Sequence, residues 1–134
     1  RNSMSDNNFG ETMKGKTGLA RVLKACGYSK NGLACAMTEA AFRQLIWLNG
    51  TLLIVLIFLD FSPITKMLLI MASFISLITE LFNTAIEAAV DHTSLAQHPL
   101  AKRAKDVGSA AQMLALLLLA ILWVMALWRD YGFN

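Results

Sequence analysis

Long apolar stretches separated by short polar segments dominate the sequence. Residues 44–59 carry no charged side chain over 16 positions, and residues 108–128 carry none over 21 positions. Between them, residues 64–90 are apolar apart from one lysine, two glutamates and some neutral polar side chains. The hydrocarbon core of a membrane is ~30 Å thick, and a helix of about 20 residues spans it. Starting the first stretch at Ala40 reaches that length, so the pattern predicts transmembrane helices at about 40–59, 64–90 and 108–128.

The segment that follows the first span predicts a tight turn. Residues 60–63 read Asp-Phe-Ser-Pro. Pro63 suits the first position of a helix, because its missing N–H is not needed there, and Ser62 suits the N-cap. The second span is therefore expected to begin directly after this turn.

The segment before the first span has the pattern of a helix that lies on the membrane surface. Residues 17–36 mix Leu, Val and Cys with Arg and Lys at helical spacings. Such a helix binds the headgroup region through its apolar and basic side chains together. Glycine is a poor helix former, so we expect interruptions near Gly27 and Gly32.

Composition agrees with a membrane protein. The chain has 134 residues, of which 56% are hydrophobic and only 16% charged, and its mean hydropathy is +0.51. Small soluble domains bury the smallest share of their surface, so this composition excludes a typical small soluble enzyme, a disulfide scaffold and a disordered chain. The expected fold is all-α, with three transmembrane helices and an N-terminal amphipathic surface helix. We divide it into a disordered tail, 1–17, with an expression remnant before Met4, and a single membrane domain, 18–134.

Positive charge is concentrated in two segments. Residues 1–43 hold seven basic and three acidic groups, and residues 91–107 hold three basic and two acidic groups. Lys and Arg favour the cytoplasmic side of a membrane. We therefore expect the N-terminus inside and the C-terminus outside, where Trp123 and Trp128 fit an aromatic belt. The charges form no stripe of the kind that binds nucleic acid.

The second predicted span carries a polar stripe. Glu80, Asn83, Glu87 and Asp91 are spaced by three, four and four residues, which places them on one face of a helix. Ionisable groups within a span are costly, so they usually face a site or a partner. Four hydrogen-bond acceptors cannot satisfy one another, and they need a bound cation, a shared proton or a basic neighbour. For Asp91 alone, the water-facing end of the helix is the simpler interpretation.

A second acidic residue lies on the same expected side of the membrane. Glu39 directly precedes the first span, so it could meet Glu87 at one level. Two carboxylates without His or Cys suit a hard ion such as Mg²⁺, which takes one or two carboxylates plus the phosphates of a substrate. The basic residues at 102–105 could neutralise nucleotide phosphates or bind lipid phosphates without specificity.

One nucleotide-binding pattern is interpreted as a coincidence. Residues 10–17 match the P-loop pattern GxxxxGK[ST]. That pattern binds phosphates only where a buried strand leads into it and a helix follows. The residues before it have no strand character, so we expect no P-loop.

Four sequence blocks occur together in one order. They are Ala25-x-Gly27-Tyr28-Ser29, then Glu39-Ala-Ala-Phe-Arg43-Gln44, then Glu80-x-x-Asn83-x-Ala-Ile-Glu87-x-x-x-Asp91, then Ala104-Lys105-Asp106-x-Gly108-Ser-Ala-Ala. In these blocks the chain resembles the bacterial integral-membrane diacylglycerol kinase family. The resemblance extends over about residues 18–130.

The resemblance implies a homotrimer in the bacterial inner membrane that acts as a lipid kinase. It implies transfer of the γ-phosphate of ATP to the hydroxyl of diacylglycerol, with Mg²⁺, giving phosphatidic acid. The implied roles are a general base for Glu80, a place at the reacting centre for Asn83, and metal binding for Glu39 and Glu87. The implied nucleotide contacts are Arg21, Tyr28, Glu39, Glu87, Lys105 and Asp106. The implied lipid contacts are Arg21, Ala25, Ser29, Arg43, Gln44 and Ser109.

Other functions stay open from the residues alone. A polyprenol (undecaprenol) kinase would share the acidic stripe, since spacing does not identify the body of the lipid. A small ion-coupled channel or transporter subunit would use Glu80 as a relay, and an interaction subunit would pair the stripe with a basic helix. Leu45 stands where the family commonly has Glu, and residues 33–38 form a shortened segment, so contacts there are not carried over.

Overall fold

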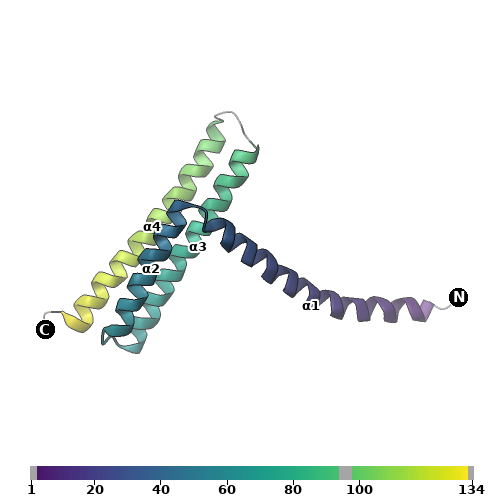
Figure 1. The fold of residues 1–134 in the computed structure, drawn as a ribbon, viewed down its shortest axis with the longest axis horizontal. Coiled ribbons are helices and arrows are strands. Elements are labelled where there is room, and N and C mark those ends of the chain that lie inside the picture. The colour runs from purple at the N-terminus through teal and green to yellow at the C-terminus, as the bar shows by residue number, and fades with distance from the viewer. Residues whose placement is uncertain (1–2, 94–97, 133–134) are drawn as a thin grey trace. The chain divides into compact units, whose positions relative to one another are not determined.

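The computed structural model describes residues 3–93 and 98–132, with side chains from residue 17 onward. Helices account for nearly all of these residues, and the described part of the chain contains no strand. In chain order the helices are α1 (Ser3–Ala36), α2 (Ala40–Phe58), α3 (Pro63–Thr93) and α4 (Pro99–Tyr131), as labelled in Figure 1. This confirms the all-α fold. The chain divides into two units, 1–37 and 38–134, which are described separately.

The first unit consists of α1. This helix runs without a break through Gly27 and Gly32, so the predicted interruptions were wrong. A glycine costs a helix only about 1 kcal/mol relative to alanine and does not prevent helical dihedral angles. The helix also begins at Ser3, inside the segment expected to be a tail, and a division at residue 17 stays a prediction. Residues 10–17 are helical, so they lack the loop that a P-loop requires.

The second unit contains three helices that are long and apolar enough to cross a membrane. They have 19, 31 and 33 residues. The predicted spans match α2 closely and lie within α3 and α4, which both extend further at their connected ends. The number of spanning helices is thus confirmed, and the protein is a multi-pass membrane protein.

The turn between α2 and α3 is held by specific hydrogen bonds. Ser62 Oγ accepts from the backbone N–H of Thr65 at 3.3 Å, which confirms Ser62 as the N-cap of α3. The backbone N–H of Ser62 donates to Asp130 Oδ2 at 2.9 Å. The backbone N–H of Asp60 donates to the hydroxyl of Tyr131. The end of α4 is therefore fastened to the turn.

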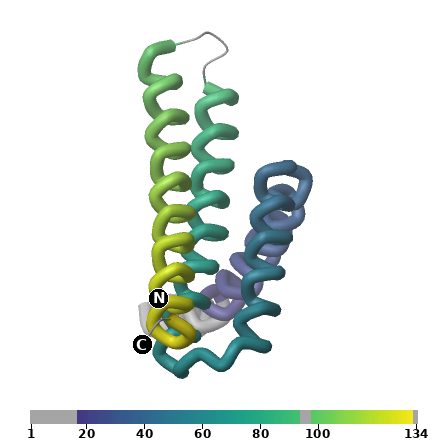
Figure 2. The backbone as a smooth tube through the Cα atoms, turned by 90° about the vertical axis from the view of Figure 1, so that its left-hand side faces the viewer, coloured from purple at the N-terminus to yellow at the C-terminus, as the bar shows by residue number. Residues whose placement is uncertain are grey.

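The packing of the three helices changes character along α3. Figure 2 shows α3 and α4 running side by side in opposite directions, and α2 packs against α3. Near the turn the core is apolar, formed by Leu56, Phe61, Leu69 and Ala126. Farther along, the buried positions of α3 become polar, at Ser73, Ser76, Glu80 and Asn83. This polar half of the interior positions the candidate site.

Candidate active site

A cavity of about 550 Å³ lies among the start of α2, the polar half of α3 and the facing part of α4. Its lining residues are Glu39, Ala41, Glu80, Asn83, Thr84, Glu87, Ser109, Gln112, Met113, Leu116 and Leu117. Three members of the α3 stripe predicted from spacing, Glu80, Asn83 and Glu87, therefore face the cavity, and they share one helix face at i, i+3 and i+7. The fourth member, Asp91, does not line it.

The solvent exposure of the stripe increases from Glu80 to Glu87. Glu80 is 6% exposed and Asn83 is 8% exposed, whereas Glu87 is exposed. Asn83 Nδ2 donates to Glu87 Oε1 at 3.4 Å. Glu80 and Glu87 are seven residues apart, which corresponds to about 10 Å along the helix. The cavity thus has a carboxylate at its buried end and another at its accessible end.

A glycine on α4 allows the close approach that forms this site. A Cβ atom placed on Gly108 would lie 2.6 Å from Asn83 Oδ1. Any larger residue there would push α4 away from α3 or displace the Asn83 amide. Small residues let membrane helices approach closely, and here the close approach positions Asn83.

The carboxylates suit a metal that is shared with a substrate. Glu39 is the N-cap residue of α2, but its side chain makes no capping hydrogen bond, and it lines the cavity with Glu87. Among the residues that the structure describes, no group of three or more His, Cys, Asp or Glu could hold a metal ion. Mg²⁺ in kinases is held by one or two carboxylates together with phosphates and water. The donor set therefore fits Mg²⁺ bound with a nucleotide, and does not fit a closed protein cage.

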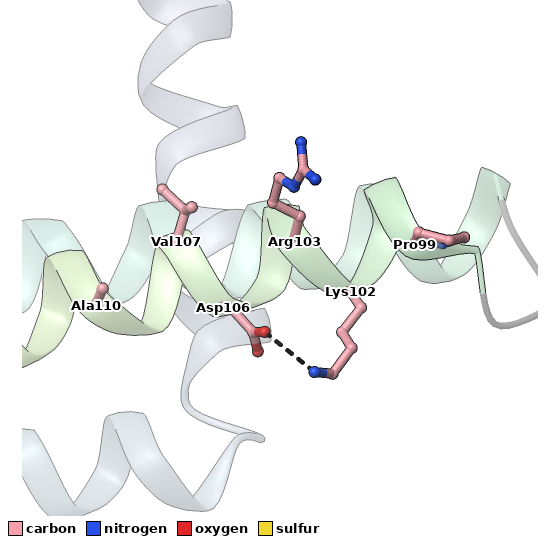
Figure 3. Close-up of a pocket in the computed structure, with 6 residues that line it drawn as sticks. All are labelled: Pro99, Lys102, Arg103, Asp106, Val107 and Ala110. Atoms are coloured by element: carbon pink, nitrogen blue, oxygen red, sulfur yellow. Dashed lines mark ion pairs between the residues drawn. The ribbon is translucent and has the colours of Figure 1, made fainter.

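Two neighbouring residues of α4 face different ways. Lys105 forms an ion pair with Asp91, at the end of the α3 stripe. Asp106 instead lies 3.6 Å from Lys102 of the same helix. It lines a separate hollow of about 360 Å³ on α4, shown in Figure 3. The structure brings Lys105 to the stripe and leaves Asp106 outside the cavity.

The comparisons with known proteins decide the family. The family model of prokaryotic diacylglycerol kinase matches residues 27–127. The chain belongs to the prokaryotic diacylglycerol kinase family. Diacylglycerol kinase of Pseudomonas aeruginosa PAO1 is 52% identical over 111 residues, covering 82% of this chain and 90% of its own length. The Escherichia coli K12 enzyme is 42% identical over 117 residues, with coverages of 87% and 96%. The Helicobacter pylori 26695 enzyme is 43% identical over 107 residues, with coverages of 79% and 84%.

Several residues with expected roles in this kinase family lie outside the cavity lining. Arg43 is exposed and donates from Nη1 to the carbonyl of Thr38 at 2.9 Å. Gln44 is also exposed. Of the three residues of the second unit expected to contact lipid, Ser109 alone lines the cavity.

The expected contacts on α1 belong to the other unit. Arg21, Ala25, Tyr28 and Ser29 are all exposed. Their spacing of four, three and one residues places them on one face of the helix. A shared face is what a common ligand would require, and the roles of these four residues in the kinase stay predictions.

Sequence reasoning missed two polar residues that line the cavity, Thr84 and Gln112. Thr84 lies beside Asn83 and resembles an ordinary helix residue, so no signal marks it. Gln112 is the single amide in the charge-free stretch 108–128. A lone amide within an apolar span is costly, and that signal could have identified it.

Proposed function

We propose that this chain phosphorylates the free hydroxyl of diacylglycerol with ATP and so forms phosphatidic acid. Family membership makes it a lipid kinase, and relatives 42% and 52% identical to it are named diacylglycerol kinases. The observation that supports this function within the molecule is one cavity lined by three carboxylates, with Glu80 buried and Glu39 and Glu87 exposed. A channel subunit or an interaction subunit is not favoured, because the relatives are named as kinases.

Glu80 is proposed as the general base. The hydroxyl oxygen of the acceptor forms a bond to the γ-phosphorus of ATP, the bond from that phosphorus to the bridging oxygen breaks, and ADP leaves. The hydroxyl proton passes to the carboxylate of Glu80, a transfer that needs a hydrogen bond between the two groups. The cavity next to Glu80 is lined by Met113, Leu116 and Leu117, which suits the apolar body of a glyceride.

Glu39 and Glu87 are proposed to hold Mg²⁺ together with the nucleotide. When bound, Mg²⁺ neutralises charge on the β- and γ-phosphates, which is the main requirement of phosphoryl transfer. Asn83 donates to Glu87 and so holds that carboxylate in position near the reacting centre. Lys105, beside Asp91, would contribute positive charge to the phosphates at the accessible end.

The remaining proposals concern the assembly and its membrane. We expect a homotrimer in the bacterial inner membrane with the N-terminus inside and the C-terminus outside. The basic segments support this orientation, since Lys and Arg favour the cytoplasmic side. ATP is cytoplasmic, so the connected ends of α3 and α4, where Glu87 lies, should face that side.

The test is a phosphorylation assay in mixed micelles. The purified chain is incubated with labelled ATP and either diacylglycerol or undecaprenol, with and without Mg²⁺. Labelled phosphatidic acid that requires Mg²⁺, with little label on undecaprenol, is the expected result. Label on undecaprenol instead would favour the polyprenol kinase, and intact ATP with both lipids would refute the lipid kinase altogether.

A further inference from the structure

Gln112 is a buried amide without a hydrogen-bond partner. Its residue is 8% exposed, and neither Nε2 nor Oε1 is bonded. It also lines the cavity that contains Glu80. Buried polar groups in folded proteins nearly always have partners, because leaving one unpaired is costly. A partner that enters the cavity would remove this cost.

The register of the two helices places Gln112 at the depth of Glu80. Gly108 is level with Asn83, since a Cβ on Gly108 would touch the Asn83 side chain. The helices α3 and α4 are antiparallel (Figure 2). Gln112 lies four residues after Gly108 on α4, and Glu80 lies three residues before Asn83 on α3. Because the helices are antiparallel, both steps run in the same direction and cover nearly the same rise. The amide therefore lies across the cavity from the proposed base.

A second buried amide shows what a structural role looks like in this bundle. Asn49 Nδ2 donates to the carbonyl of Leu45 at 2.9 Å and to Ser76 Oγ at 3.0 Å. It therefore binds its own helix and links α2 to α3. Gln112 makes neither kind of bond, although it is also buried, at 8% exposure against 1% for Asn49. Only Oδ1 of Asn49 is unpaired, whereas both polar atoms of the Gln112 side chain are. This contrast favours a role for Gln112 in binding rather than in packing.

The chemistry of the acceptor supplies a matching group. Diacylglycerol carries ester carbonyls close to its free hydroxyl, and a carbonyl oxygen is an acceptor for an amide N–H. With Glu80 facing the hydroxyl, the amide across the cavity is at the depth where an ester would lie. The apolar lining residues Met113, Leu116 and Leu117 follow along α4, where acyl chains would continue.

We infer that Gln112 is a specificity-determining residue that donates a hydrogen bond to an ester carbonyl of the acceptor lipid. This inference rests on the proposed function. Both amide atoms are covered by protein, so the side chain turns toward the ester when the acceptor binds. The same contact distinguishes diacylglycerol from an alcohol without esters, such as a polyprenol.

The test compares two acceptors that differ only in the carbonyls. One is dioleoylglycerol, and the other is the dialkyl ether analogue with the same chains and the same free hydroxyl. In Gln112→Leu we expect KM for the ester to rise about fivefold to tenfold, because a change of this size corresponds to the free energy of one hydrogen bond. KM for the ether and for ATP should stay at the wild-type values, so the preference for the ester disappears.

Two further variants serve as controls. Asn49→Leu removes a buried amide of the bundle outside the cavity, and its ratio of ester to ether KM should equal that of wild type. Gln112→Asn keeps the amide on a shorter side chain and should retain part of the preference, which tests the inference if Gln112→Leu fails to fold.

Distinct results would overturn the inference. The inference would be overturned if the wild-type enzyme had the same KM for the ester and the ether. It would also be overturned if Gln112→Leu raised KM equally for both acceptors. Loss of the oligomer in Gln112→Leu and Gln112→Asn, seen by size-exclusion chromatography, would show that the amide pairs with a second copy instead. The proposed function fails differently, because then the wild-type chain phosphorylates neither acceptor.

Discussion

A difference in burial separates two similar carboxylates on one helix. Glu80 lies at 6% exposure beside apolar lining residues, and Glu87 lies exposed at the other end of the cavity. Phosphate groups and their metal ions need the accessible end, and a lipid hydroxyl needs the apolar end. The gradient along α3 therefore matches the two substrates of a lipid kinase in their required order.

Exchanging either carboxylate for an amide should separate the two roles. We expect Glu80→Gln to lower turnover about 100-fold or more, as the loss of a general base does, with KM for Mg-ATP unchanged. Glu87→Gln should instead raise the Mg²⁺ concentration that gives half-maximal activity. Initial rates over a range of Mg²⁺ and ATP concentrations measure both effects.

A control and a contrary result are available for this pair. Asp60→Asn removes a carboxylate at the α2–α3 turn, away from the cavity, and should keep wild-type turnover and Mg²⁺ dependence. Near-normal phosphorylation by Glu80→Gln would refute its assignment as the base.

Single residues also show where sequence reasoning succeeds and where it stops. The stripe from Glu80 to Glu87 is predictable because helical periodicity alone places its members on one face. Burying ionisable groups in a membrane costs free energy, so their presence there indicates a site. Asp106 is adjacent to Lys105 in the sequence, yet the two side chains face different ways, because neighbours on a helix differ by about 100°. Gln112 carries a weak signal, and only its unpaired atoms and the cavity show what it faces.

At the scale of helices, the apolar runs predict where a helix crosses the membrane, but they do not predict where that helix begins and ends. The helix α4 begins at Pro99, well before the charge-free stretch, because residues 101–105 are alanine, lysine and arginine, which are good helix formers. His98 is its N-cap, and the His98 side chain accepts from the N–H of Leu100 at 3.1 Å. Pro99 at the first helical position marks this start in the sequence, whereas hydropathy does not.

The approach of α4 to α3 at Gly108 leaves no room for a larger side chain. Gly108→Ala places a methyl group against Asn83, and overpacking of this kind costs about 1–3 kcal/mol. We expect a lower melting temperature and a loss of turnover, because Asn83 also holds Glu87. Thermal unfolding in detergent and the micelle assay measure the two effects.

Another glycine in a transmembrane helix provides the matched control. A Cβ on Gly50 of α2 would meet nothing within 4 Å. Gly50→Ala should therefore leave stability unchanged or raise it by up to about 1 kcal/mol through the higher helix propensity of alanine. Equal behaviour of the two variants would contradict the role assigned to Gly108.

At the scale of the molecule, one copy of the chain does not gather every expected nucleotide contact. Asp106 lines a hollow that shares no residue with the cavity around Glu80. If Asp106 and Glu80 serve the same reaction, we expect them to come from different copies of the chain. Many large apolar side chains of α2, α3 and α4 are exposed, as a surface in contact with lipid or with other copies requires.

Mixing two variants that are each expected to be inactive, Glu80→Gln and Asp106→Asn, tests whether a site is shared between copies. Equal amounts of Glu80→Gln and Asp106→Asn, unfolded and reassembled together, should recover about a quarter of wild-type turnover. A site that takes Glu80 from one copy and Asp106 from its neighbour has both residues intact in about a quarter of random pairings. Each variant reassembled alone should stay inactive. No recovery in the mixture would place both residues of each site in one chain.

The bonds that fasten Tyr131 and Asp130 to the α2–α3 turn have a consequence for how a lipid could enter. They close one end of the helix bundle, and the aromatic edge contacts of Phe61 with Trp123 and Tyr131 reinforce it. At the opposite end, the side chains of α3 and α4 are linked by the exposed ion pair of Lys105 with Asp91. With the turn end held closed, a bulky glyceride would reach Glu80 from the side of the bundle, where α2 and α4 line the cavity.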